Sequence, residues 1–143
     1  MEDVFGPHQI RVEGDIAVIV FNGDLTAEDA HKMFAVFEAI VEQYGRYGTL
    51  VDARRMGRVT QEARGVVAQW PYTGLTFGTS VFGASLATRT VMTLVIRALQ
   101  LIGRGPLATE FFPTQAQAQE WIRARSKEAA AAQQAALSRS TTR

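Results

Sequence analysis

Alternating apolar and polar residues near the start of the chain predict the first strands. Residues 9–13 alternate, Gly14 and Asp15 have turn chemistry, and residues 16–21 are rich in β-branched side chains. This pattern predicts a β-hairpin whose second strand ends at residues 22–24.

Apolar residues at steps of three and four then predict a helix. It follows Thr26, a typical N-cap, carries Glu28 and Asp29 in its first turn, and ends at Gly45. Residues 54–59 are polar and are expected to form a loop. Further strands are expected at residues 49–53, 76–84 and 107–112, and further helices at residues 60–70, 86–102 and from residue 114 onward.

The order of these elements predicts the fold class. A hairpin followed by strands that alternate with helices indicates an α/β fold with a single mixed, mostly parallel β-sheet of about five strands. The N-terminal hairpin is antiparallel, and about four helices cover the sheet. We expect the domain to span residues 1–125. Residues 126–143 are an Ala/Gln-rich basic tail that extends the last helix or is disordered, with fraying expected from Ser138 onward.

Composition narrows the classes of function. The chain has 143 residues, 47% of them hydrophobic and 20% charged, as in an ordinary globular domain. It has no cysteine, and its two histidines, His8 and His31, lack the spacing of metal ligands, so we expect neither a disulfide nor a metal site. Residues 91–102 form the longest apolar stretch, which is too short to span a membrane. The first residues do not have the pattern of a signal peptide, and we expect the protein in the cytoplasm.

The charge is unevenly distributed. The net charge is +1, but residues 121–143 carry +4 and the preceding residues −3, which is not typical of a nucleic-acid-binding protein. No glycine-rich phosphate loop is present, and neither histidine is placed to activate a serine. We therefore expect no catalytic residue, no cofactor and no nucleic-acid partner.

Candidate binding residues lie where the parallel strands are expected to end, because ligands tend to bind at that rim of an open sheet. Arg54, Arg55 and Arg58 can hold a phosphate or carboxylate there; alternatively, they belong to a solvated loop and pair with Asp52 and Glu62. Thr60 and Ser85 are expected to cap helices, a role that is compatible with accepting a phosphate. The whole predicted rim consists of Asp24, Asp52, Arg54, Arg55, Arg58, Thr60, Ser85 and Arg89.

The helix at residues 86–102 is apolar over more than one face. One stripe is expected to face the sheet and consists of Val91, Leu94, Val95, Ala98 and Ile102. A neighbouring stripe of Met92, Ile96 and Leu99 is then left as the interface of a homodimer, unless a neighbouring helix covers it.

Three short motifs, together with the order of elements, give the chain a family resemblance. They are Gly23-Asp24-Leu25-Thr26, Leu50-Val51-Asp52, and Phe111-Phe112-Pro113-Thr114 before a helix that contains Ala118 and Trp121. Over about residues 9–123, the chain resembles the bacterial STAS-like family, the anti-sigma-factor antagonist fold, and especially its SpoIIAA-like branch. Phosphorylated members carry an Asp-Ser pair at the start of the second helix. This chain has Val59-Thr60-Gln61 there, so Thr60 stands near the phosphorylated position but lacks the preceding Asp, and the resemblance leaves phosphorylation of Thr60 or Ser85 open.

The resemblance implies a non-enzymatic domain that binds a protein partner, a nucleotide-bearing kinase or, in some branches, a small or lipid-like ligand. Our leading hypothesis is a regulatory or scaffolding protein-interaction domain. The alternative is a carrier of a small or lipid-like anion, which would use the rim of the sheet and the Arg54–Arg58 loop. A third hypothesis is an enzyme whose catalytic residues do not form a known motif.

Overall fold

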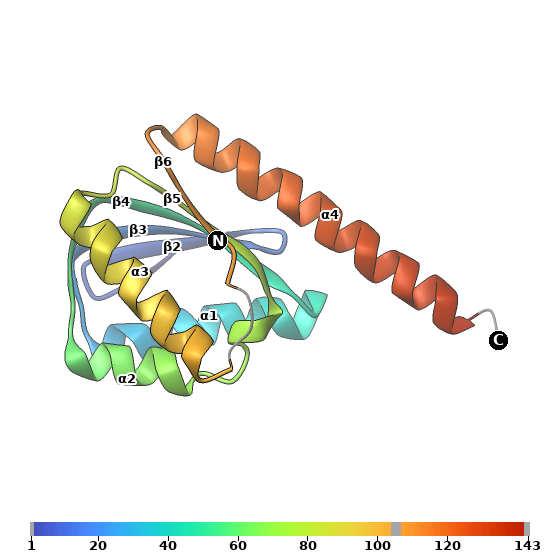
Figure 1. Cartoon of the computed structure of the whole chain (residues 1–143), viewed down its shortest axis with the longest axis horizontal. Helices are drawn as coiled ribbons and strands as arrows, with labels where there is room; N and C mark the ends of the chain where they lie inside the picture. Colours follow the sequence, from blue (N-terminus) through green and yellow to red (C-terminus); the bar gives the residue numbers. More distant parts are fainter. Residues whose placement is uncertain (1, 104–106, 142–143) are drawn as a thin grey trace.

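One mixed sheet forms the centre of the molecule (Figure 1). The structure is a computed structural model that describes residues 2–103 and 107–141. Within them the spatial order of the six strands is their order along the chain. The first three strands pair antiparallel and the last four pair parallel. The strands are β1 (Glu2–Phe5), β2 (His8–Glu13), β3 (Ile16–Leu25), β4 (Tyr47–Val59), β5 (Thr76–Phe82) and β6 (Thr109–Phe112).

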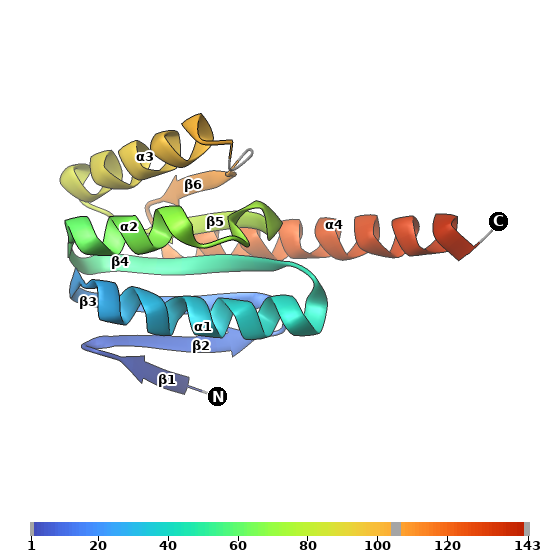
Figure 2. The same ribbon diagram turned by 90° about the horizontal axis from the view of Figure 1, so that it is seen from below.

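Four α-helices cover the two faces of the sheet within the described residues. They are α1 (Ala27–Tyr44), α2 (Gln61–Gln69), α3 (Leu86–Leu101) and α4 (Gln115–Thr141), and a 3-10 turn, η1, spans Thr73–Leu75. The first three connect successive parallel strands. Because such crossovers are right-handed, these three helices lie on the same face, with α4 on the other (Figure 2). The predicted caps are confirmed: Thr26, Thr60 and Ser85 accept helix N–H groups, and Gly45 ends α1 with a φ of 74°.

Each face of the sheet has its own hydrophobic core, because successive strand residues point to opposite faces. Under α1 and α2, Ile19 and Val51 of the sheet pack with an aromatic group in which Phe34 stacks on Trp70 at 4.6 Å. On the other face, Leu50 packs against Ile122 of α4. The larger core thus lies beneath the three crossover helices.

The predicted fold class is confirmed, with one additional strand at the edge. β1 was not predicted because its four residues are too few to show an alternating pattern. Gly6 and Pro7 nevertheless turn the chain so that Phe5 lies opposite His8 of β2. Phe5 is buried, so this short strand contributes to the core.

The predicted loop at residues 54–59 is instead the second half of β4. β3 also continues past its predicted end, and the two strands remain paired with Asn22 opposite Arg55 and Leu25 opposite Val59. Two register shifts accompany this extension. The pairing uses backbone groups, so polar side chains did not prevent it.

The predicted orientation of α3 is wrong. Leu99 is only 5% exposed and Met92 packs against the larger core, so the stripe of Met92, Ile96 and Leu99 faces inward. Leu94 and Ile102, which were expected to face the sheet, are each 59% exposed. Because the helix was apolar on both stripes, its sequence did not determine which one faces the core.

α4 is one uninterrupted helix that extends well beyond the sheet (Figure 1). It passes through the predicted boundary at residue 125 and includes Ser138, where fraying was expected; residues 142–143 lie outside the described residues. Ser126 donates a hydrogen bond to Asp15 at 2.6 Å, and the side-chain amide of Gln133 donates to the carbonyl of Tyr44 at 3.0 Å. These contacts hold the helix against the body beyond residue 125.

Candidate functional site

The eight predicted rim residues do not form one site. Two of them, Asp52 and Arg54, form an ion pair on β4. Nε and Nη2 of Arg54 donate to the two carboxylate oxygens of Asp52 at 3.0 and 2.8 Å, and the guanidinium lies 5.5 Å from the centre of the Phe82 ring. The Arg54 guanidinium is therefore already paired with Asp52, as expected from the alternative in which the arginines form ion pairs within the protein. Arg55 is exposed and lines a shallow hollow with Asp52 and Arg54.

Asp52 is largely buried and its charge is balanced locally. Burial acts to raise the pKa of the Asp52 carboxyl. The hydrogen bonds from Arg54, its charge and that of Arg55 outweigh this effect and hold the pKa below its ordinary value. The charged carboxylate is thus part of the folded state.

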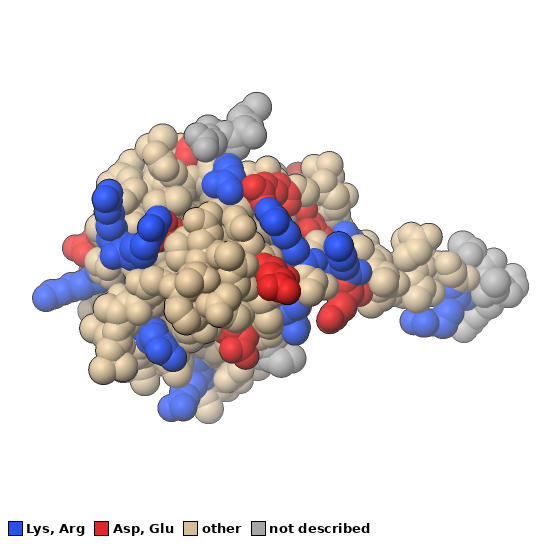
Figure 3. Space-filling view, turned by 90° about the horizontal axis from the view of Figure 1, so that it is seen from above, with Lys and Arg blue, Asp and Glu red and all other residues tan. Residues whose placement is uncertain are grey.

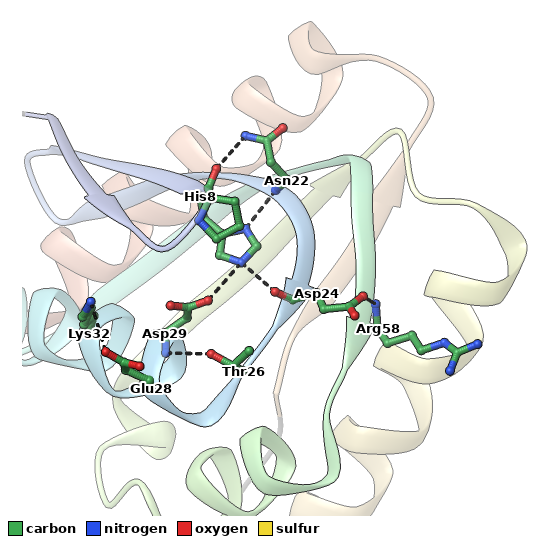
Figure 4. Close-up of polar contacts among 9 residues, drawn as sticks. His8, Asn22, Asp24, Thr26, Glu28, Asp29, Lys32 and Arg58 are labelled. Atoms are coloured by element: carbon green, nitrogen blue, oxygen red, sulfur yellow. Dashed lines mark hydrogen bonds and ion pairs between the residues drawn. The ribbon is translucent and has the colours of Figure 1, made fainter.

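Asp24 connects the extended ends of β3 and β4. Its Oδ1 accepts a hydrogen bond from the backbone N–H of Arg58 at 2.7 Å (Figure 4). A Cβ on Gly57 would collide with this carboxylate and with the backbone of Gly23, so the close approach requires glycine. Asp24 has a structural role here.

A groove between α2 and α3 brings together the best candidate binding residues. Its first part, a hollow of about 470 Å³, is lined by Arg58, Arg64, Ser85 and Thr88. The second part, of about 310 Å³, is lined mainly by apolar residues of α3, including Leu94 and Ile102. Arg64 and Val91 line both parts, which makes the groove continuous.

The groove is basic at one end and apolar at the other. Among the described residues, no acidic side chain lines either part. Within the same part of the chain, neither Arg58 nor Arg64 forms an ion pair. Both guanidinium groups are therefore available to an incoming carboxylate or phosphate.

The remaining predicted rim residues act within the protein. The Thr60 hydroxyl accepts from the N–H of Ala63 at 3.1 Å, and the Ser85 hydroxyl accepts from the N–H of Thr88 at 3.1 Å. The Arg89 guanidinium lies 5.1 Å from the centre of the Phe111 ring, outside the lining of the groove. Of the eight predicted rim residues, the structure brings only Arg58 and Ser85 together in the groove.

Sequence reasoning missed Arg64 as a groove residue. Its place beside α3 follows from the packing of α2 and not from its position in the sequence. The outward side chains of Leu94 and Ile102 were missed for the reason given above: both stripes of α3 are apolar.

A buried histidine forms a second polar cluster (Figure 4). His8 is fully buried; its Nδ1 accepts from the N–H of Asn22 at 2.9 Å, and its Nε2 donates to the carbonyl of Asp24 at 3.0 Å. Asp29 lies 3.6 Å from the same Nε2. This arrangement assigns the proton of the neutral ring to Nε2 and ties the turn after β1 to β3 and to the start of α1.

The groove contrasts with the face that carries α4. There, basic and acidic side chains are intermingled over the surface (Figure 3). In the part of the chain that the structure describes, no three His, Asp or Glu side chains are grouped as metal ligands. No helix in that part is both long and apolar enough to cross a membrane.

Solved structures share this fold. No protein-family model and no curated protein sequence matches the chain. An uncharacterized DUF3478-family protein with a SpoIIAA-like fold, from Shewanella loihica PV-4, matches with a TM-score of 0.56 and 17% identity, over 78% of this chain and 88% of that one. The anti-sigma factor antagonist SpoIIAA in its unphosphorylated form matches with a TM-score of 0.54 and 15% identity, over 81% and 97%. The likeness confirms the predicted STAS-like fold.

Proposed function

We propose that this chain is a non-enzymatic regulatory or scaffolding domain of the bacterial cytoplasm that binds a protein partner in the groove between α2 and α3. The observation that carries the proposal is the outward apolar row of α3 beside Arg58 and Arg64, which form no ion pair with any residue that the structure describes. Leu94 and Ile102 keep more than half of their surface exposed, and large apolar side chains gathered on one helix are typical of interaction sites. The SpoIIAA-like fold supports a role in protein binding.

The groove favours a partner of defined chemistry. Its apolar part fits a segment with aliphatic or aromatic side chains, and burying one such side chain contributes about 1.5–3 kcal/mol. Its basic end fits a carboxylate at one end of the same segment, because a guanidinium binds a carboxylate through two parallel hydrogen bonds. We therefore infer an amphipathic partner segment that ends in an aspartate or glutamate.

The rival function, a carrier of small anions at Arg54–Arg58, has less support. Asp52 already accepts two hydrogen bonds from the Arg54 side chain, and Arg58 lines a different hollow from Arg54 and Arg55. These arginines therefore do not converge on one anion.

Site-specific cross-linking tests the proposal. A photoreactive residue at position 94 should capture a partner in the native host, and the linked peptide should be amphipathic and acidic at one end. Leu94→Asp and Arg64→Glu should each weaken binding of the purified partner about tenfold or more, since each removes a contact in the centre of the interface. Val4→Asp is the matched control, because Val4 is 71% exposed on β1, at the opposite edge of the sheet.

Two outcomes would reject the proposal. One is a partner that binds Leu94→Asp and Arg64→Glu as tightly as the parent. The other is capture of a second copy of this chain at position 94, with a dimer in sedimentation equilibrium that Leu94→Asp dissociates. That result would assign this face to a homodimer, through Leu94 and not through the stripe of Met92, Ile96 and Leu99 that the sequence predicted as a dimer interface.

A further inference from the structure

A pocket of about 190 Å³, partly open to the surface, lies between α3 and the sheet, on the inner side of the helix. α1 and α2 supply Phe34 and Val67, α3 supplies Ile96 and Leu99, and the sheet supplies Val51 among others. No charged side chain lines the pocket among the described residues. This space is separate from the polar rim and is almost wholly apolar.

One wall of the pocket nevertheless carries hydroxyl groups. Thr49, Thr79 and Thr109 lie side by side on three neighbouring strands, and the hydroxyls of Thr49 and Thr79 are 2.9 Å apart. A pair of hydroxyls has two O–H donors, and the bond between them uses one, so one O–H remains available to a guest. Thr109 donates its own hydroxyl to the carbonyl of Leu107.

The lining determines what the pocket can hold. An ion would lose its hydration without gaining a charged partner, so ions are excluded. A water molecule needs about two to four polar partners, and a mostly apolar space provides few of them. Dry apolar cavities of about 150 Å³ bind benzene-sized molecules, so a pocket of this size suits a substituted ring or a short alkyl chain.

We propose that this pocket is a binding site for a small, neutral, mainly apolar molecule that bears one hydrogen-bond-accepting oxygen. The oxygen accepts from the Thr49–Thr79 pair, and the apolar part fills the space against α1, α2 and α3. α3 is the wall that can adjust most easily to the guest, because α1 buries six of its side chains and α3 buries only Leu99. This site lies on the inner side of α3, shares Val95 and Leu99 with the lining of the partner groove, and takes a different class of ligand from the anion expected at the rim.

Three probes of similar size test the proposal: acetophenone, which has a carbonyl oxygen, cumene, which is apolar, and benzoate, which is charged. Each is titrated into the isotope-labelled full chain and followed by NMR. Acetophenone and cumene should give saturable shifts of amides in β5 and α3, and benzoate should give none. An absence of saturable shifts with both neutral probes, or binding of benzoate as tight as that of acetophenone, would overturn the assignment.

Two sets of variants locate the guest. The double variant Thr49→Val/Thr79→Val keeps the shape of the wall and removes the hydroxyls, so acetophenone should bind about fivefold more weakly while cumene binds at least as well. Ile96→Phe should fill the pocket and abolish both, with Val67→Phe as a second filling variant should the first fail to fold. Leu101→Ala, on α3 at a position 88% exposed and outside the lining of the pocket and of the groove, is the control and should change neither. Unchanged acetophenone binding in the double variant, or in a folded filling variant, would refute the site.

Discussion

His8 links three parts of the chain through the two nitrogens of one ring. It also packs against aromatic neighbours, with its ring centre 4.9 Å from that of Phe5 and 5.2 Å from that of Phe21. The ring thus has an apolar contact surface and two polar edges, and both edges are used. Sequence analysis could not assign this role, because a single histidine in an alternating strand gives no sign of what lies opposite it.

His8→Phe separates the contribution of the hydrogen bonds of His8 from that of its apolar ring contacts. Phenylalanine keeps a ring in place but leaves the N–H of Asn22 and the carbonyl of Asp24 without their partner, at a cost of about 2–4 kcal/mol for two partly buried groups. Urea unfolding should show this loss in the free energy of unfolding. His31→Phe, at an exposed position on α1, is the control and should change stability by less than about 0.5 kcal/mol. Equal effects of the two substitutions would contradict the assigned role.

The ion pair of Asp52 predicts a pH dependence of stability. The folded-state pKa of Asp52 is below its ordinary value, so its contribution is present above the unfolded-state pKa of about 3.9 and is lost as pH falls through the folded-state value. Asp52→Asn should therefore be less stable than the parent at pH 7, by about 1 kcal/mol because Arg54 is exposed and its charge is screened. The difference should begin to shrink near pH 4 and disappear only at lower pH, once the carboxyl is protonated in the folded state as well. A difference that is constant from pH 7 to pH 2 would argue against the charged pair.

At the scale of elements, the caps and ends of helices were easier to predict than the length of a strand or the direction in which side chains point. Caps and helix ends follow from local chemistry, and Thr26, Thr60, Ser85 and Gly45 could be read from the sequence. The extension of β4 through Gly57 and Val59 could not, because its stability comes from hydrogen bonds to β3 and not from its own apolar pattern. The groove depends on which stripe of α3 faces outward, and only packing against the sheet decides that.

α4 joins the body mainly through a small buried patch. Ile122 is 1% exposed and lies on Leu50 and Phe82 of the sheet, so Ile122→Ala should reduce the free energy of unfolding by about 2–4 kcal/mol. Leu137→Ala, farther along the same helix at a position 55% exposed, should reduce it by less than about 0.5 kcal/mol. Thermal or urea unfolding measures both. A larger effect at Leu137 than at Ile122 would show that the distal part of α4 packs more firmly than the structure indicates.

At the scale of the whole molecule, protection of the backbone should be graded. β3 and β4 lie inside the sheet and pair on both sides, whereas the last turns of α4 extend past the contact of Gln133 with Tyr44. Amide hydrogen exchange should be slowest in β3 and β4 and fastest in α4 beyond Gln133, by several orders of magnitude, because local opening is easier where few contacts must break. Uniform protection along α4 would contradict this gradient.

The agreement between the order of the strands in space and along the chain has a consequence for synthesis. Each strand that leaves the ribosome finds its partner already at the growing edge, and no later strand has to insert between two that are already paired. The face under α1, α2 and α3 can therefore close stepwise as translation proceeds. The opposite face stays open until α4 emerges, since the contacts of Ser126 with Asp15 and of Gln133 with Tyr44 join the last helix to early parts of the chain. The apolar side chains beneath α4 are thus the surface of the nascent chain most exposed to chaperones and to misassembly.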